Sequence, residues 1–172
     1  PMSYATAALA TFTNMLGTLD HLIGKAAAHE QGEALLQAQL AEDMFPLATQ
    51  IRFTITQVIV TLDRLGNLGG ASDESDISGF ADARSRIAAA QELVASTDSA
   101  SWPAADAVVE FDLPNGMAFA LQAHEYVRDW AVPQFYFHLM ATYAILRQHG
   151  LPVGKADYVP HMMRYLKAPA AV

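Results

Sequence analysis

The chain has 172 residues, a net charge of −8 and no cysteine, with 52% hydrophobic and 16% charged residues. This composition predicts one folded domain over residues 1–172 and excludes disorder, disulfide scaffolds, thiolate zinc sites and cysteine nucleophiles. The ten Lys and Arg residues are scattered, which argues against nucleic acid or an acidic membrane surface as a partner. The N-terminus lacks signal-peptide features, and no apolar run approaches the roughly 20 residues that span a bilayer, so we expect a soluble cytoplasmic protein.

The N-terminal stretch predicts a long amphipathic helix that begins near Tyr4. Ser3 can cap this helix, because its side-chain oxygen can accept a hydrogen bond from a free N–H group of the first turn. The segment 33–40 predicts a short helix after it. The apolar residues that recur at helical spacing in the first helix are Phe12, Met15, Leu16, Leu19, Leu22 and Ile23.

A second long helix is predicted from about Phe45 to Leu65. Asp43 is placed to cap its start, and Gly66-Asn67 is typical of a helix end. Inward-facing polar groups on a helix this apolar need partners, because an unpaired buried amide costs about 1–3 kcal/mol. Three residues form such a polar line beside the apolar stripe: Gln50, Thr54 and Gln57.

The middle of the chain predicts a third helix and a hairpin. A Gly-, Ser- and Asp-rich loop over 67–78 precedes a helix from about residue 78 to residue 95. Asn115-Gly116 lies between two apolar runs, which is a strong hairpin signal. Because a lone hairpin is only marginally stable, we expect this one to pack on the helices.

The stretch 133–148 predicts a helix that is apolar on nearly every side. Pro133 suits its first position, and Gly150 suits the left-handed residue beyond its end. A helix that is hydrophobic all round is normally buried, so we expect it to be covered on every side, in part by a second copy in a homodimer. Its polar residues Gln134 and His138 are four positions apart and share one face. After it, Lys155 and Asp157 can pair to hold the C-terminal tail.

Four long helices and one hairpin predict an all-α four-helix bundle, with the hairpin between helices three and four. Bundles build their sites from side chains that project inward from facing helices. The candidate site therefore combines His138 and Gln134 with Gln50 and, if the start of the second helix turns inward, Asp43. Neutral amides are weak ligands for zinc or nickel, so His138 is either a hydrogen-bonded core histidine or a ligand or catalytic residue.

The chain also resembles the DinB/YfiT-like superfamily, and more closely an uncharacterised bacterial branch of it, the domain-of-unknown-function family numbered nineteen ninety-three. The superfamily has a four-helix bundle with a metal site of three histidines, one on the second helix and two on the fourth. By this resemblance His138 matches the last histidine, whereas Gln134 and Gln50 stand where the others are expected. The motifs that carry the resemblance are 40–50 (Leu-Ala-x-Asp-Met-Phe-Pro-Leu-x-x-Gln), 133–138 (Pro-x-Phe-x-Phe-His), 144–147 (Ala-Ile-Leu-Arg) with Gly150, and 154–157 (Gly-Lys-x-Asp).

Two functions from different classes remain open at this point. In the first, the His138 site weakly binds a divalent metal, zinc or nickel, which activates a water or thiol as in a metal-dependent transferase or hydrolase. Without metal, His138 would be a general base oriented by Asp43. In the second, the superfamily metal site has degenerated, and the bundle is a non-catalytic protein that binds a small-molecule ligand or associates with itself.

Overall fold

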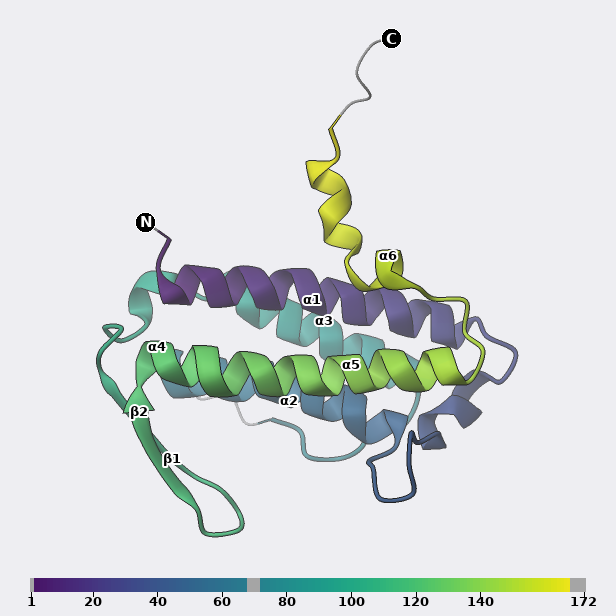
Figure 1. Cartoon of the computed structure of the whole chain (residues 1–172), viewed down its shortest axis with the longest axis horizontal. Coiled ribbons are helices and arrows are strands. Elements are labelled where there is room, and N and C mark those ends of the chain that lie inside the picture. Colours follow the sequence, from purple (N-terminus) through teal and green to yellow (C-terminus); the bar gives the residue numbers. More distant parts are fainter. Residues whose placement is uncertain (1, 68–71, 168–172) are drawn as a thin grey trace.

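The computed structural model describes residues 2–67 and 72–167 and confirms the predicted four-helix bundle with a small hairpin (Figure 1). Helices α2 and α5 lie side by side, as do α1 and α3, and these two pairs make the most extensive helix contacts. None of the described helices is long and apolar enough to cross a membrane. The four long helices are α1 (Tyr4–Ala27), α2 (Leu47–Gly66), α3 (Phe80–Ser96) and α5 (Val132–Gln148).

The start of α1 agrees with the sequence prediction, but the start of α2 does not. Ser3 caps α1, and its Oγ accepts a hydrogen bond from the backbone N–H of Thr6 at 3.1 Å. Pro46 is the N-cap residue of α2 and no side chain caps this helix, so the prediction that Asp43 caps it is wrong. The extended backbone of Pro46 moves the helix start to Leu47, which leaves Asp43 exposed in the preceding turn.

The helical bundle is completed by short elements at its connections. After α1 a 3-10 helix, η1, covers part of the predicted segment 33–40, and after α3 a single 3-10 turn, η2, leads toward the hairpin. A short helix α6 and a 3-10 helix η4 follow α5. Their bounds are η1 (Gly32–Gln37), η2 (Ser99–Ser101), α6 (Lys155–Tyr158) and η4 (Pro160–Tyr165).

The predicted hairpin is present and packs on the start of the last long helix. Strands β1 (Val108–Asp112) and β2 (Ala118–Gln122) pair antiparallel. Gly116 has a φ of 86°, a left-handed conformation that glycine adopts without strain. The ring of Phe111 stacks on the strand partner Phe119 and contacts Tyr126 and Trp130. The last two residues lie in the π-helical turn η3 (Tyr126–Ala131), which connects α4 (Ala123–Glu125) to α5.

Helix α5 is buried on its inner side only. Phe135 is fully buried, and its ring meets that of Phe12 edge to face, with centroids 5.3 Å apart. On the outer side Phe137 is 61% exposed and Met140 48% exposed. The bundle itself therefore covers only one half of α5, and cover of the other half by a second copy stays a prediction.

The C-terminal elements are attached to α1 by one carboxylate. Asp157 in α6 accepts hydrogen bonds from His21 Nε2 at 2.8 Å and from Lys25 Nζ at 3.1 Å. These contacts hold the pKa of Asp157 well below its usual range. The carboxylate of Asp157 thus holds the tail as predicted, but by pairing with α1 rather than with Lys155.

Replacing Phe135 by alanine should lower the free energy of unfolding by about 3–5 kcal/mol, because it leaves a cavity in a fully packed core. Urea denaturation followed by circular dichroism measures this change. The matched control is Gln148→Ala on the exposed surface of the same helix, which should change stability by less than about 0.5 kcal/mol. Equal effects of the two substitutions would contradict the described core.

Candidate functional site

The contact between α2 and α5 brings two of the predicted site residues together. Gln50 is only 1% exposed and His138 only 8% exposed. The Nδ1 atom of His138 lies 2.9 Å from Oε1 of Gln50, within hydrogen-bond distance. The sequence separation is 88 residues, so this pairing depends on the bundle and not on local structure.

The neighbours of Gln50 define the tautomer of His138. The Nε2 atom of Gln50 donates a hydrogen bond to the backbone carbonyl of Phe45 at 3.2 Å, which turns the amide oxygen toward the imidazole. That oxygen can only accept, so Nδ1 of His138 carries the proton. In the neutral ring Nε2 then has a free lone pair, and it has no hydrogen-bond partner among the described residues.

A stack of side chains keeps His138 neutral. The ring of Phe53 lies 4.9 Å from the imidazole, measured between centroids, and the guanidinium of Arg52 lies 4.3 Å from the centroid of the Phe53 ring. Burial lowers the pKa of His138 from 6.5 to about 4, and the positive charge of Arg52 acts in the same direction. At neutral pH His138 is therefore an uncharged hydrogen-bond acceptor.

The other two predicted site residues do not join this pair. Gln134 is half-buried and lines a shallow surface pocket with Pro133 and Phe137, one turn before His138. Asp43 is exposed and makes no hydrogen bond to His138. Thr142, one turn after His138, is fully buried, and its Oγ1 has no partner among the described residues.

The donor set fits a zinc or nickel centre poorly. Residues 2–67 and 72–167 contain no cluster of three His, Cys, Asp or Glu side chains that could hold a metal ion. The amide oxygen of Gln50 already accepts from His138, which removes it as a ligand in this arrangement. The possible ligands that remain are Nε2 of His138 and the neutral amide of Gln134. Catalytic zinc sites use about three protein ligands, so these two are too few.

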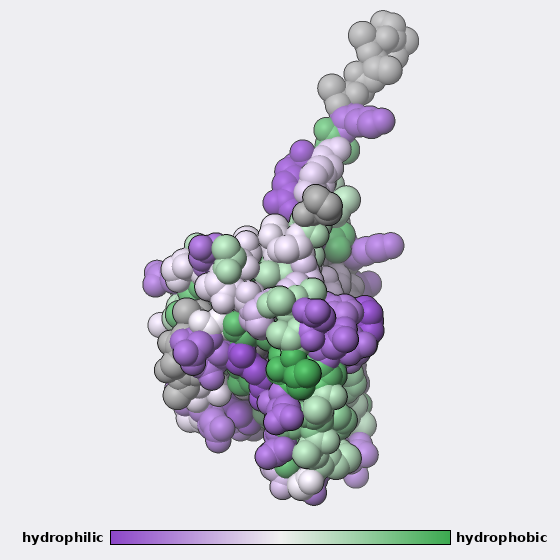
Figure 2. Space-filling model, turned by 90° about the vertical axis from the view of Figure 1, so that its left-hand side faces the viewer, coloured by the Kyte–Doolittle hydropathy of each residue, from purple (hydrophilic) through white to green (hydrophobic). Residues whose placement is uncertain are grey.

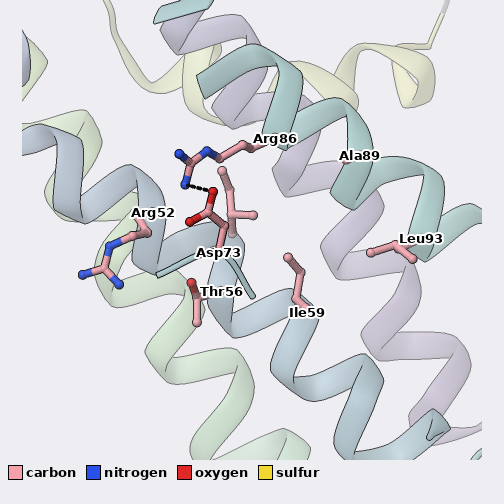
Figure 3. Close-up of a pocket in the computed structure, with 8 residues that line it drawn as sticks. Arg52, Thr56, Ile59, Asp73, Arg86, Ala89 and Leu93 are labelled. Carbon is pink, nitrogen blue, oxygen red and sulfur yellow. Dashed lines mark ion pairs between the residues drawn. The ribbon is translucent and has the colours of Figure 1, made fainter. Parts of the chain in front are cut away.

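The sequence analysis missed a second hollow, between α2 and α3 (Figure 3). Its apolar walls include Ile59 and Leu93, and the ion pair of Arg86 with Asp73, at 3.2 Å, closes one end. Figure 3 shows the guanidinium of Arg52 turned away from that pair, and it binds Asp76 instead. The helical spacing of Arg52, Thr56 and Ile59 is the signal that marks this face of α2 in the sequence.

The low pKa of His138 makes stability depend on pH in a defined window. The unfolded chain binds a proton on this histidine near pH 6.5, whereas the folded chain does so only near pH 4. The free energy of unfolding should therefore fall as the pH drops from 6.5 to 4, by an amount on the order of 2–3 kcal/mol from this group.

Urea denaturation at several pH values measures this dependence. In His138→Asn the amide can still donate to Gln50 but cannot titrate, so the excess dependence between pH 4 and 6.5 should disappear. His124→Asn, at a half-buried histidine in α4 that bonds the carbonyl of Ala105, is the control and should keep the wild-type pH dependence. An unchanged pH profile in His138→Asn would contradict the buried, neutral state of His138.

Comparison with known proteins agrees with this fold. A family model described as a domain of unknown function, DUF1993, matches residues 4–159. The crystal structure of a DinB family member protein from Shewanella denitrificans is similar over 95% of this chain and 92% of its own, with 27% identity and a TM-score of 0.74. Comparison with curated proteins gave no match. The family match covers most of the sequence, and the chain therefore belongs to the DUF1993 family and has a DinB-like fold.

Proposed function

We propose that this chain is a non-catalytic bundle that binds a small molecule, with Nε2 of His138 accepting a hydrogen bond from the ligand. The observation that carries the proposal is the hydrogen bond between Gln50 and His138. It supports a neutral imidazole with Nδ1 protonated and a lone pair on Nε2. Such a group binds a hydrogen-bond donor without any change in charge.

Binding agrees better with this geometry than catalysis does. A general base works best when its pKa lies near the operating pH, and the pKa of His138 is about 4. The orienting partner of His138 is a neutral amide rather than a carboxylate, so a proton taken up by the ring has no negative charge to stabilise it. Asp43, which the general-base hypothesis needs beside His138, lies exposed in the turn before α2.

The surroundings indicate the class of ligand. Nε2 of His138 can accept from a hydroxyl or N–H group, and the half-buried amide of Gln134 can both donate and accept. Gln134 lines a shallow pocket one helical turn before His138, and His138 itself does not line it, so the proposed ligand reaches Nε2 from this pocket. Pro133 and Phe137 supply apolar surface beside Gln134. The ligand is therefore a small alcohol, phenol or amide with an apolar body rather than a charged metabolite.

The test is nuclear magnetic resonance of protein labelled with 15N-histidine, titrated with phenol, benzyl alcohol and benzamide as probes. At pH 7 the ring of His138 should be protonated on Nδ1 alone, and a bound probe should shift the Nε2 signal. In His138→Asn the affinity should fall about tenfold, the effect of one lost hydrogen bond. His124→Asn is the matched control and should bind as the wild type does.

The competing metal-dependent transferase or hydrolase makes the opposite prediction. Protein purified without an affinity tag would be titrated with zinc, nickel and manganese, in the wild type and in His138→Asn. We expect no affinity tighter than micromolar that depends on His138. A tight, His138-dependent metal site, or probes that never shift the Nε2 signal, would overturn the proposed function.

A further inference from the structure

The C-terminal residues 160–167, here named the arm, project outward from the α1 side of the bundle (Figure 1). Both Figure 1 and Figure 2 show this segment projecting away from the body, beyond α6. Its large apolar side chains are uncovered, with Met163 64% and Leu166 75% exposed. Soluble chains rarely leave such residues together in water without a partner.

The base of the arm is tied to α1, so its direction is defined. Asp157 binds α1 through His21 and Lys25, three residues before the arm begins. Within the arm, Nη2 of Arg164 donates to Oδ1 of Asn14 in α1 at 2.9 Å. These contacts hold the arm on the α1 side and direct its apolar tip outward.

A separate apolar groove lies between α5 and the segment before α2, and the chain itself leaves it open. Phe137 and Met140 form one wall, and both are among the most exposed large side chains of the long helices. The opposite wall comes from Leu40 and Met44. Pro133, Tyr136, Ala141 and Ala144 complete the lining of this groove.

The charges of the arm and of the groove edge are complementary. Glu42 and Asp43 are exposed in the segment that forms one wall of the groove, and neither makes an ion pair within the described ranges 2–67 and 72–167. The arm carries Arg164 and Lys167, which likewise have no carboxylate partner among the described residues. A basic, apolar arm thus matches an apolar groove with an acidic edge.

We infer that the occupant of the groove is the arm of a second copy of this chain. The base of the arm packs on both α1 and α5, through Asp157 and Tyr158, but the arm itself projects away from the segment before α2 (Figure 1). Exchange of two arms between two copies is a closed, twofold arrangement in which the same surfaces are used twice. Met162 and Met163 suit such a contact, because methionine adapts to irregular apolar surfaces.

The test measures mass in solution by analytical ultracentrifugation across a range of concentrations. The wild type should be a dimer. Met163→Glu/Leu166→Glu removes the apolar arm, Phe137→Glu/Met140→Glu blocks the groove, and each should raise the dimer dissociation constant at least a hundredfold. Val108→Glu is the matched control, since Val108 is an equally exposed apolar residue on the hairpin, and it should stay dimeric.

We name Met163→Glu/Leu166→Glu the arm variant and Phe137→Glu/Met140→Glu the groove variant. Mixing these two variants distinguishes a dimer formed by arm exchange from a dimer formed in another way. The arm variant keeps an intact groove and the groove variant keeps an intact arm, so an equimolar mixture should form a heterodimer that neither forms alone. A wild type that stays monomeric, an arm variant that stays dimeric, or a mixture that stays monomeric would each overturn the inference.

A second pair of variants keeps the test valid if the groove variant fails to fold. Glu42→Lys/Asp43→Lys changes only exposed side chains and should raise the dissociation constant about tenfold, because charges at a rim contribute modestly. Combining it with Lys167→Glu, which leaves the bond of Arg164 to Asn14 in place, should lower the dissociation constant again. Failure of that charge reversal to restore dimerisation would refute the proposed contact between the arm and the acidic edge.

Discussion

The packing of α2 against α5 is the contact on which the rest of this structure depends. Both helices place polar groups in the contact, and a polar group buried without a partner costs about 1–3 kcal/mol. Between α2 and α5 this cost is avoided chiefly by one hydrogen bond, between Gln50 and His138. Because Gln50 also binds the carbonyl of Phe45, this bond links the start of α2 to the middle of α5.

The same bond explains how this site differs from the three-histidine metal site that the sequence resemblance implies. A histidine at position 50 or 134 would offer a lone pair to a shared ion. The oxygen of the Gln50 amide instead accepts a hydrogen bond from Nδ1–H of the imidazole, so these two atoms satisfy each other. With glutamine at position 50, the amide and the imidazole form a closed pair that leaves one acceptor, Nε2 of His138, without a partner among the described residues. The proposed binding function follows from that remaining acceptor, Nε2 of His138.

On its outer surface the bundle leaves several large apolar side chains exposed to water. The inner halves of α1, α2, α3 and α5 form one core, but Phe137 and Met140 on α5 and the projecting residues 160–167 remain uncovered. The hydrophobic effect is roughly proportional to the apolar area removed from water, so these two surfaces gain most from meeting each other. The carboxylate of Asp157 contributes indirectly, since it attaches the segment that carries the arm to α1.

The sequence by itself determined the number and order of the long helices, the hairpin at Asn115-Gly116 and the cap at Ser3, because apolar periodicity, turn residues and caps act over a few neighbouring positions. It also indicated His138, Gln134 and Gln50 as inward polar residues. Only the tertiary structure decided that Gln50 meets His138 while Gln134 stays at the surface. The sequence cannot show this, because it depends on how two helices 88 residues apart are rotated against each other. The same holds for the outer face of α5, since an all-round apolar pattern does not tell which side a neighbouring helix covers.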